Sequence, residues 1–205
     1  MHWGGDNVLI RKAIAESYFF DQALVSNRFN EIAIKFNAQA PLPARWQSIR
    51  KPGIVSQCGY NACDIDTNGN AKVRSVIAKD TGYTISAGNT VFVNYKISHI
   101  WGNAQNPRYF TNYWNLVLVP AWANDLLDKP NAKQGSITSK MLNTYMEICM
   151  KYYNMNGLAW TKIGMQAAPN GIKHQDVVKG NFVFNVIEAS VGKKLGHIRK
   201  DNLKL

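Results

Sequence analysis

The sequence has few cysteines, few acidic residues and no long hydrophobic run. Three cysteines in 205 residues are too few for a disulfide framework, and their odd number predicts reduced thiols. No apolar run approaches the ~18 residues that a membrane-spanning helix needs. The first residues are polar and do not have the pattern of a signal peptide. These absences predict a cytoplasmic protein without a membrane partner.

Basic residues outnumber acidic ones, with 24 Lys and Arg against 13 Asp and Glu, a net charge of +11. A surplus of this size favours a polyanionic partner, because binding releases the counterions of that partner. The alternative is a protein that is simply basic. Hydrophobic residues make up 46% of the chain, which indicates a globular protein with a substantial core.

The first two of three chain segments differ in their hydrophobic pattern. Residues 1–52 predict a helical arm and a proline-rich linker, because apolar residues recur at helical spacing before the prolines begin. Asp6 is the expected cap of the first helix, and Asp21 or Ser26 is expected to begin the second. Residues 53–132 predict β structure, and the expected strands lie at 73–78, 83–86 and 91–97.

The third segment, residues 133–205, predicts a helix, a strand and a basic tail. Residues 136–154 are expected to form the longest helix, capped by Ser136. Residues 181–189 are expected to form a strand, and the tail from 193 to 205 is expected to stay mobile until it meets phosphate. The three segments together predict one compact α+β domain.

Two metal-like motifs are incomplete. Asp64–Asn70 begins like a calcium-binding loop, but the twelfth position is Ser75 rather than Glu, which favours a polar turn. Cys58 and Cys63 lack a second pair at zinc spacing. Buried thiols, including Cys149, are therefore the preferred interpretation.

The region from residue 91 to residue 129 has a more specific pattern. His99 ends an amphipathic strand, and Asn115, Asn124 and Asp128 follow it by 16, 25 and 29 residues. Ser98-His99-Ile100 at the end of one strand, Asn115-Leu116 at the start of the next, and Asn124 in a helix before Lys129 resemble the HNH nuclease family. Its fold is also called ββα-metal. The resemblance implies this core within residues 91–129, with the helical arm and a C-terminal helix and strand extension around it.

The resemblance also implies a role for each polar residue. His99 would be the general base that takes a proton from the attacking water, and Asn115 would fasten the long loop and orient His99. Asn124 would bind one divalent cation, with Asp128 as a second ligand one helical turn later. Residues four apart share a helix face, and hard oxygen ligands suit Mg²⁺ or Mn²⁺.

Residue 98 departs from the family pattern, which usually has a metal-binding Asp, Glu or His before the first His. With Ser98 in that place, either Asp128 supplies the charge, the metal site is weak, or activity has been lost. Asp125 is a competing ligand, but it lies on a different helical face from Asn124.

The expected function is metal-dependent hydrolysis of DNA phosphodiester bonds, leaving a 5′-phosphate and a 3′-hydroxyl. Compact relatives with comparable surroundings are often type II restriction endonucleases, which act as homodimers on palindromic sites of double-stranded DNA. The alternatives are a non-catalytic DNA-binding protein on the same fold and an RNA-directed nuclease or toxin. The basic residues expected to contact nucleic acid are Arg108, Arg45, Arg50, Lys51, Lys193, Lys194, Arg199 and Lys200.

Overall fold

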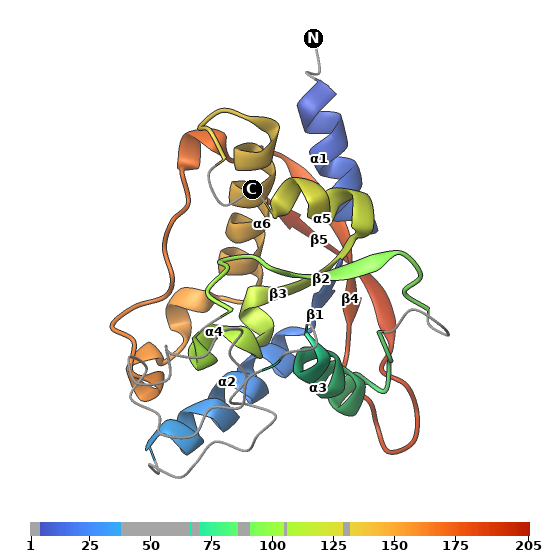
Figure 1. The fold of residues 1–205 in the computed structure, drawn as a ribbon, viewed down its shortest axis with the longest axis vertical. Helices are drawn as coiled ribbons and strands as arrows, with labels where there is room; N and C mark the ends of the chain where they lie inside the picture. Colours follow the sequence, from blue (N-terminus) through green and yellow to red (C-terminus); the bar gives the residue numbers. More distant parts are fainter. Residues whose placement is uncertain (1–4, 38–65, 67–69, 86–90, 105, 129–131) are drawn as a thin grey trace.

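The computed structural model describes residues 5–37, 66, 70–85, 91–104, 106–128 and 132–205 (Figure 1). Within these residues the chain forms six α-helices and one five-stranded sheet, which confirms the expected α+β class. The helices are α1 (Gly5–Glu16), α2 (Gln22–Asn37), α3 (Ala71–Thr81), α4 (Pro107–Phe110), α5 (Ala121–Leu127) and α6 (Ile137–Tyr152). The strands are β1 (Tyr18–Phe20), β2 (Tyr95–His99), β3 (Leu116–Pro120), β4 (Asn181–Ile187) and β5 (Ile198–Lys204).

The strand order in the sheet is β2-β3-β1-β4-β5, so all three chain segments contribute strands. Strand β1 runs parallel to β4, and the other neighbouring pairs are antiparallel. The carboxyl ends of β2, β1 and β4 therefore lie at the same end of the sheet as the amino ends of β3 and β5. We call this end the His99 end, because His99 is the last residue of β2.

The N-terminal segment contains the two expected helices and also the short central strand β1. Ser17 ends α1, and its hydroxyl donates to the carbonyl of Ala13 at 2.7 Å. Asp21 begins α2 as expected, since its Oδ1 accepts from the backbone N–H of Ala23 at 2.8 Å. Phe19 and Phe20, between the helices, are fully buried. The arm is thus part of the core.

The expected strand at 73–78 is wrong, because these residues belong to α3. Val73, Val76 and Ile77 are buried at helical spacing, and a short apolar run does not distinguish a helix from a strand. Gly82 ends the helix at φ 76, with its N–H donating to Ala78. Tyr83–Ile85 are not in a strand either, and the strand expected at 91–97 begins only at Tyr95.

The expectation of a mobile tail is also wrong, because β5 pairs with β4 along its whole length. Arg199 forms ion pairs with Asp21 at 3.1 Å, Glu188 at 2.8 Å and Asp201 at 2.6 Å. Charged residues occupy both faces of β5, so the sequence lacks the alternation that marks a half-buried strand.

Helix α6 confirms the expected long helix and packs on the sheet. Ser136 caps it by accepting from the N–H of Ser139 at 3.2 Å. Tyr145 is fully buried and stacks on Phe19 with 5.9 Å between ring centroids. Burial raises the pKa of the Cys149 thiol, so the thiol stays protonated.

Across the described part of the chain, no helix combines the length and apolarity needed to cross a membrane.

Candidate functional site

Residues 95–127 form a strand, a loop, a second strand and a helix in direct succession. Strands β2 and β3 pair from Tyr95 opposite Pro120 to His99 opposite Leu116. Helix α5 follows β3 directly and packs against both strands. The loop between the strands, residues 100–115, contains α4 and lies at the His99 end of the sheet (Figure 1).

Asn115 closes this loop with its side chain and its backbone. The side chain is fully buried, and its Oδ1 accepts from the N–H of Trp101 at 2.8 Å. Its Nδ2 donates to the carbonyls of Gly102 and Tyr109, both at 3.1 Å. Its own carbonyl accepts from the N–H of Ile100 at 2.9 Å. The amide therefore holds the beginning and the middle of the loop together.

His99 is half-buried and held in one orientation by the same loop. Its Nε2 lies 2.9 Å from the carbonyl oxygen of Phe110, and its ring stacks on the Phe110 ring at 5.3 Å and 9°. A carbonyl oxygen only accepts, so this contact requires a proton on Nε2, and in the neutral ring Nδ1 then carries the lone pair. The contact with Phe110 thus selects the tautomer that the neutral ring adopts.

An aromatic cluster supports the loop from inside the protein. The fully buried Trp114 packs edge-on against Trp101 at 5.8 Å, Tyr109 at 5.0 Å and Trp160 at 5.2 Å. Burial raises the pKa of Tyr109. Arg108 donates from Nε to the carbonyl of Ile163 at 2.6 Å. This bond fixes the loop to the 3-10 helix at Trp160–Ile163.

A buried polar network fastens the far side of the loop to α2 and α3. The Nε of Arg28 donates to the carbonyl of Thr111 at 3.2 Å, and the hydroxyl of Tyr113 donates to Asp80 Oδ2 at 2.9 Å. The Nη1 of Arg28 lies 3.9 Å from the same Asp80 oxygen. Burial raises the pKa of Tyr113, which keeps its hydroxyl a donor. Sequence reasoning missed these residues, because they lie far apart in the chain and match no motif.

Of the expected metal ligands, Ser98 belongs to β2, Asn124 to α5, and Asp128 directly follows α5. The N–H of Asp128 donates to the carbonyl of Asn124 at 2.9 Å, so the helical spacing continues and their side chains lie on one side of α5. Ser98 is 8% exposed and shares a face of β2 with Lys96, whose Nζ reaches Asp125 on α5 at 3.1 Å. Ser98 therefore lies on the side of β2 that α5 covers.

The three residues have side-chain oxygens of the kind that hard cations bind. They offer hydroxyl, amide and carboxylate oxygens, which are the donors that Mg²⁺ and Mn²⁺ accept. Asp125, the competing ligand, is paired with Lys96, and Asp128 is the carboxylate among the three expected ligands. Among the residues with a described position, no three His, Cys, Asp or Glu side chains gather as a metal-binding group. Ser98 thus leaves the set with a single charge.

Five of the basic residues expected at nucleic acid have a described position: Arg108, Lys193, Lys194, Arg199 and Lys200. Lys193 and Lys194 are exposed in the turn between β4 and β5, at the His99 end, and Lys200 is exposed on β5. Arg199 is held by its three ion pairs. The remaining predicted residues, Arg45, Arg50 and Lys51, and the motif residues Cys58 and Cys63 lie outside the described residues.

A family model described as "Uncharacterised protein PM1201" matches residues 54–189, which is more than half of the chain. The chain belongs to this family. The matched region contains the whole unit from β2 to α5, with His99 and Asn115, and also α3, α6 and β4. Neither the curated proteins nor the solved structures contain a match to the chain.

Proposed function

We propose that this protein is a metal-dependent endonuclease of the HNH type that hydrolyses phosphodiester bonds in double-stranded DNA. The finer proposal is a sequence-specific, type II restriction endonuclease that acts as a homodimer. Two observations support the proposal: β2, a loop, β3 and α5 follow one another in the order expected for a ββα-metal core, and the net charge of +11 suits a polyanionic substrate.

The observation that carries the proposal is the joint geometry of His99 and Asn115. A histidine at a strand end is commonly structural, but here its Nε2–H is held by the Phe110 carbonyl. Asn115 fixes the loop that bears this carbonyl through three side-chain hydrogen bonds. A general base needs this arrangement, because a fixed tautomer and orientation present one basic nitrogen to the substrate.

In the proposed reaction, Nδ1 of His99 accepts a proton from a water molecule as its oxygen attacks phosphorus. The bond from phosphorus to the 3′ oxygen breaks, and the leaving oxygen takes a proton from solvent, which gives a 5′-phosphate and a 3′-hydroxyl. The Phe110 carbonyl stabilises the imidazolium that forms, since it accepts from Nε2–H throughout.

The divalent cation would be held by Asn124, Asp128 and Ser98. When bound, it supplies positive charge that stabilises the developing charge on the phosphate and on the leaving oxygen. Because Ser98 is neutral, Asp128 would be the single carboxylate that binds the cation. We therefore expect the cation to bind weakly without DNA.

The test is incubation of unmethylated plasmids with the wild type or His99→Ala in Mg²⁺ or Mn²⁺, followed by gel analysis. We expect discrete fragments from the wild type and a cleavage rate lower by about 10²–10⁴-fold in the variant, the usual contribution of a general base. His174→Ala is the matched control, because His174 is exposed and lies in a separate 3-10 helix, His174–Asp176. A smear would contradict sequence specificity, and cleavage of RNA alone would contradict the DNA substrate.

A second candidate is a DNA-binding protein that has the fold without cleavage. Ser98 favours it, because a hydroxyl is a poor replacement for an acidic ligand. Intact DNA in both metals, together with tight DNA binding, would support this candidate and contradict the nuclease.

A further inference from the structure

The connection between β4 and β5, residues 188–197, ends in a tight two-residue turn. Val191 and Lys194 pair across it, with the N–H of each donating to the carbonyl of the other at 3.3 and 3.1 Å. Gly192, at φ 60, and Lys193 are the two residues of the turn. A positive φ at the first turn position suits glycine and gives a twist that matches the strands. We call residues 190–196 the basic turn.

The basic turn is fixed to the end of α3. Ser190 donates to the carbonyl of Asp80 from its N–H at 2.9 Å and from its hydroxyl at 3.2 Å. The N–H of Gly196 donates to the carbonyl of Thr81 at 2.8 Å. Gly82 allows this approach, because a Cβ there would lie 2.9 Å from Leu195 Cδ2. These contacts hold the turn in one position before any ligand binds.

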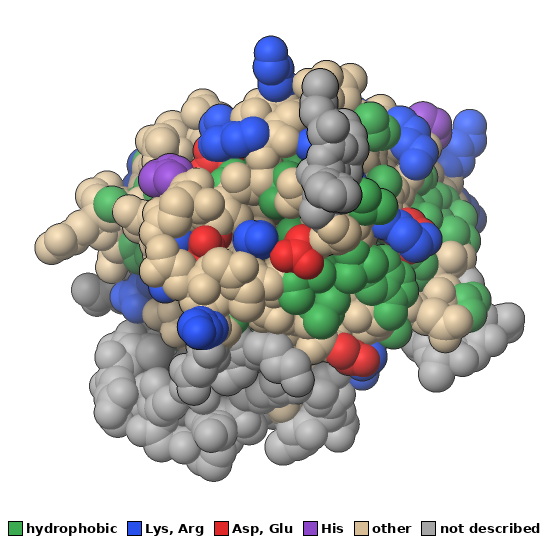
Figure 2. Space-filling model, turned by 90° about the horizontal axis from the view of Figure 1, so that it is seen from above, with side chains coloured by type: hydrophobic (Ala, Val, Ile, Leu, Met, Phe, Trp, Pro, Cys, Tyr) green, Lys and Arg blue, Asp and Glu red, His purple; other side chains and the backbone are tan. Residues whose placement is uncertain are grey.

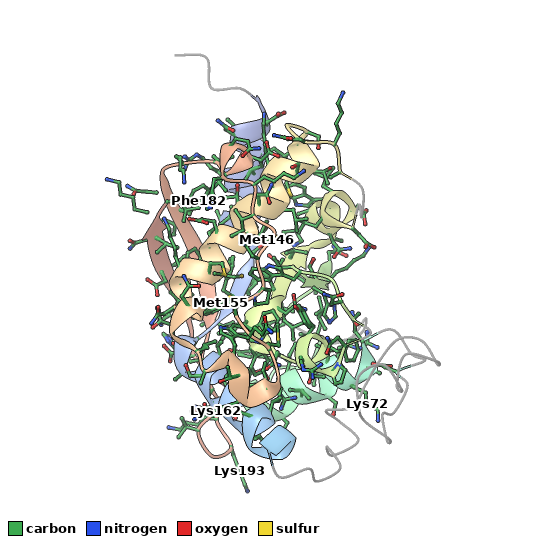
Figure 3. All side chains as sticks on the ribbon, turned by 90° about the vertical axis from the view of Figure 1, so that its left-hand side faces the viewer. Lys72, Met146, Met155, Lys162, Phe182 and Lys193 are labelled. Atoms are coloured by element: carbon green, nitrogen blue, oxygen red, sulfur yellow. The ribbon has the colours of Figure 1, made fainter. Side chains whose placement is uncertain are left out.

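The outer surface of the basic turn is both basic and apolar. Lys193 and Lys194 are exposed, as are Val191 at 77% and Leu195 at 57%. Figure 1 shows the turn beside α3, and Figure 3 shows Lys193 projecting away from the protein. Figure 2 views the opposite end, where acidic side chains lie among the basic ones. Adjacent exposed lysines on a rigid support favour a polyanionic partner.

Asp80 connects the basic turn to the loop of His99. Its carbonyl accepts from Ser190, and its carboxylate accepts from Tyr113, two residues before Asn115. The turn and the loop also lie at the same end of the sheet, because β4 and β2 both finish there. The distance between the turn and His99 is thus set by a short chain of hydrogen bonds and by the sheet.

We infer that the basic turn docks into the major groove of duplex DNA and holds the duplex at a fixed position relative to His99. The major groove of B-DNA admits an element as wide as two paired strands, and the tip of the basic turn, where Val191 pairs with Lys194, has this width. In that groove lysines meet phosphates or guanine edges, and apolar side chains meet thymine methyls. The major groove of A-form RNA is too narrow for such an element. The choice of DNA rests on the proposed function, whereas the docking element rests on the turn itself.

The test measures binding of a labelled duplex DNA by fluorescence anisotropy over a range of salt concentrations, in EDTA so that nothing is cleaved. The variant is Lys193→Gln with Lys194→Gln. The matched control is Lys179→Gln with Lys204→Gln, which removes the same charge from exposed lysines at the opposite end of the β4–β5 pair. Unchanged thermal midpoints in both variants verify their folding.

We expect the Lys193 and Lys194 variant to bind about tenfold more weakly, with the slope of log K against log salt smaller in magnitude by about 2. The control should lose less affinity, and its salt slope should change less. Equal losses of affinity in the variant and the control would overturn the inference, and so would duplex RNA that competes as well as duplex DNA.

The docking proposal and the nuclease proposal can fail separately. If the protein cleaves DNA and the variant binds DNA as well as the wild type, only the docking element is contradicted. Weakened binding by a protein that cuts no DNA contradicts only the nuclease.

Discussion

Residue 98 sets the charge of the candidate metal site. Ser98 lies on the side of β2 that α5 covers and is almost completely buried. Asn124 and Asp128 bring only one negative charge between them, and hard cations bind more tightly as carboxylates are added. The neutral residue 98 is therefore the position at which a substitution is expected to strengthen metal binding.

We predict that Ser98→Asp makes stability depend on metal. Without a cation, a second carboxylate in a nearly buried position should destabilise the protein by about 1–3 kcal/mol. With Mn²⁺ the carboxylate gains a partner, so the thermal midpoint should recover. Circular dichroism in EDTA and in Mn²⁺ measures both midpoints. Adding Asn124→Ala should remove the recovery. A thermal midpoint of Ser98→Asp that is the same in EDTA and in Mn²⁺ would contradict the assigned ligands.

At the scale of elements, the loop between β2 and β3 is held by side chains rather than by regular backbone pairing. Asn115 closes it from within, Arg108 ties it to Ile163, and Arg28 ties it to α2. A loop fixed from three sides can present the Phe110 carbonyl to His99 with constant geometry. We infer that the polar residues of the loop serve its shape, and that His99 depends on that shape.

We predict that Asn115→Ala destabilises the protein by about 3 kcal/mol, because it leaves buried backbone groups without their partners. Cleavage per folded molecule should also fall steeply, although His99 is unchanged. Urea unfolding and the plasmid assay give the two quantities.

Asn185→Ala is the control for this loss. The Asn185 amide also donates to two backbone carbonyls, those of Ala15 and Ser17, away from the loop. This variant should lose stability but keep its cleavage rate. If Asn115→Ala cleaved as fast as Asn185→Ala, the loop would not be what positions His99.

The elements that sequence reasoning identified are those with a strong local pattern. A continuous run or stripe of buried residues marks each of β3, α5, α6 and β4. Helix α3 was mistaken for a strand because Val73, Val76 and Ile77 fit either period in so short a run. The sequence could not reveal the hydrogen bond from His99 to the Phe110 carbonyl, because every residue has a backbone carbonyl.

At the scale of the whole molecule, distant segments complete the sheet. Strand β1 has three residues and pairs with both β3 and β4, so the N-terminal segment joins the other two. Arg199 on β5 reaches Asp21, the residue that begins α2, and Tyr152 of α6. Neither β1 nor β5 was predictable locally, because β1 is too short for a period and β5 is stabilised by ion pairs and by pairing with β4.

We predict that removing residues 197–205 abolishes cooperative folding. The deletion removes β5, exposes one edge of β4, and uncovers part of the core around the buried Phe182 and Phe184. Burial of each phenylalanine contributes about 1.5–3 kcal/mol, and the loss of the ladder and of the Arg199 ion pairs adds to this. Against a total stability of about 5–15 kcal/mol, the sum is enough to unfold the protein.

Thermal and urea unfolding of the shortened chain measure this outcome. The full-length variant Lys200→Gln with Lys204→Gln is the control, since both side chains are exposed and their replacement should change stability by less than about 0.5 kcal/mol. A shortened chain that melts as sharply as the full-length protein would mean that β5 is a removable basic tail. A chain that does not fold, beside a stable control, would mean that the basic residues of β5 belong to a structural strand.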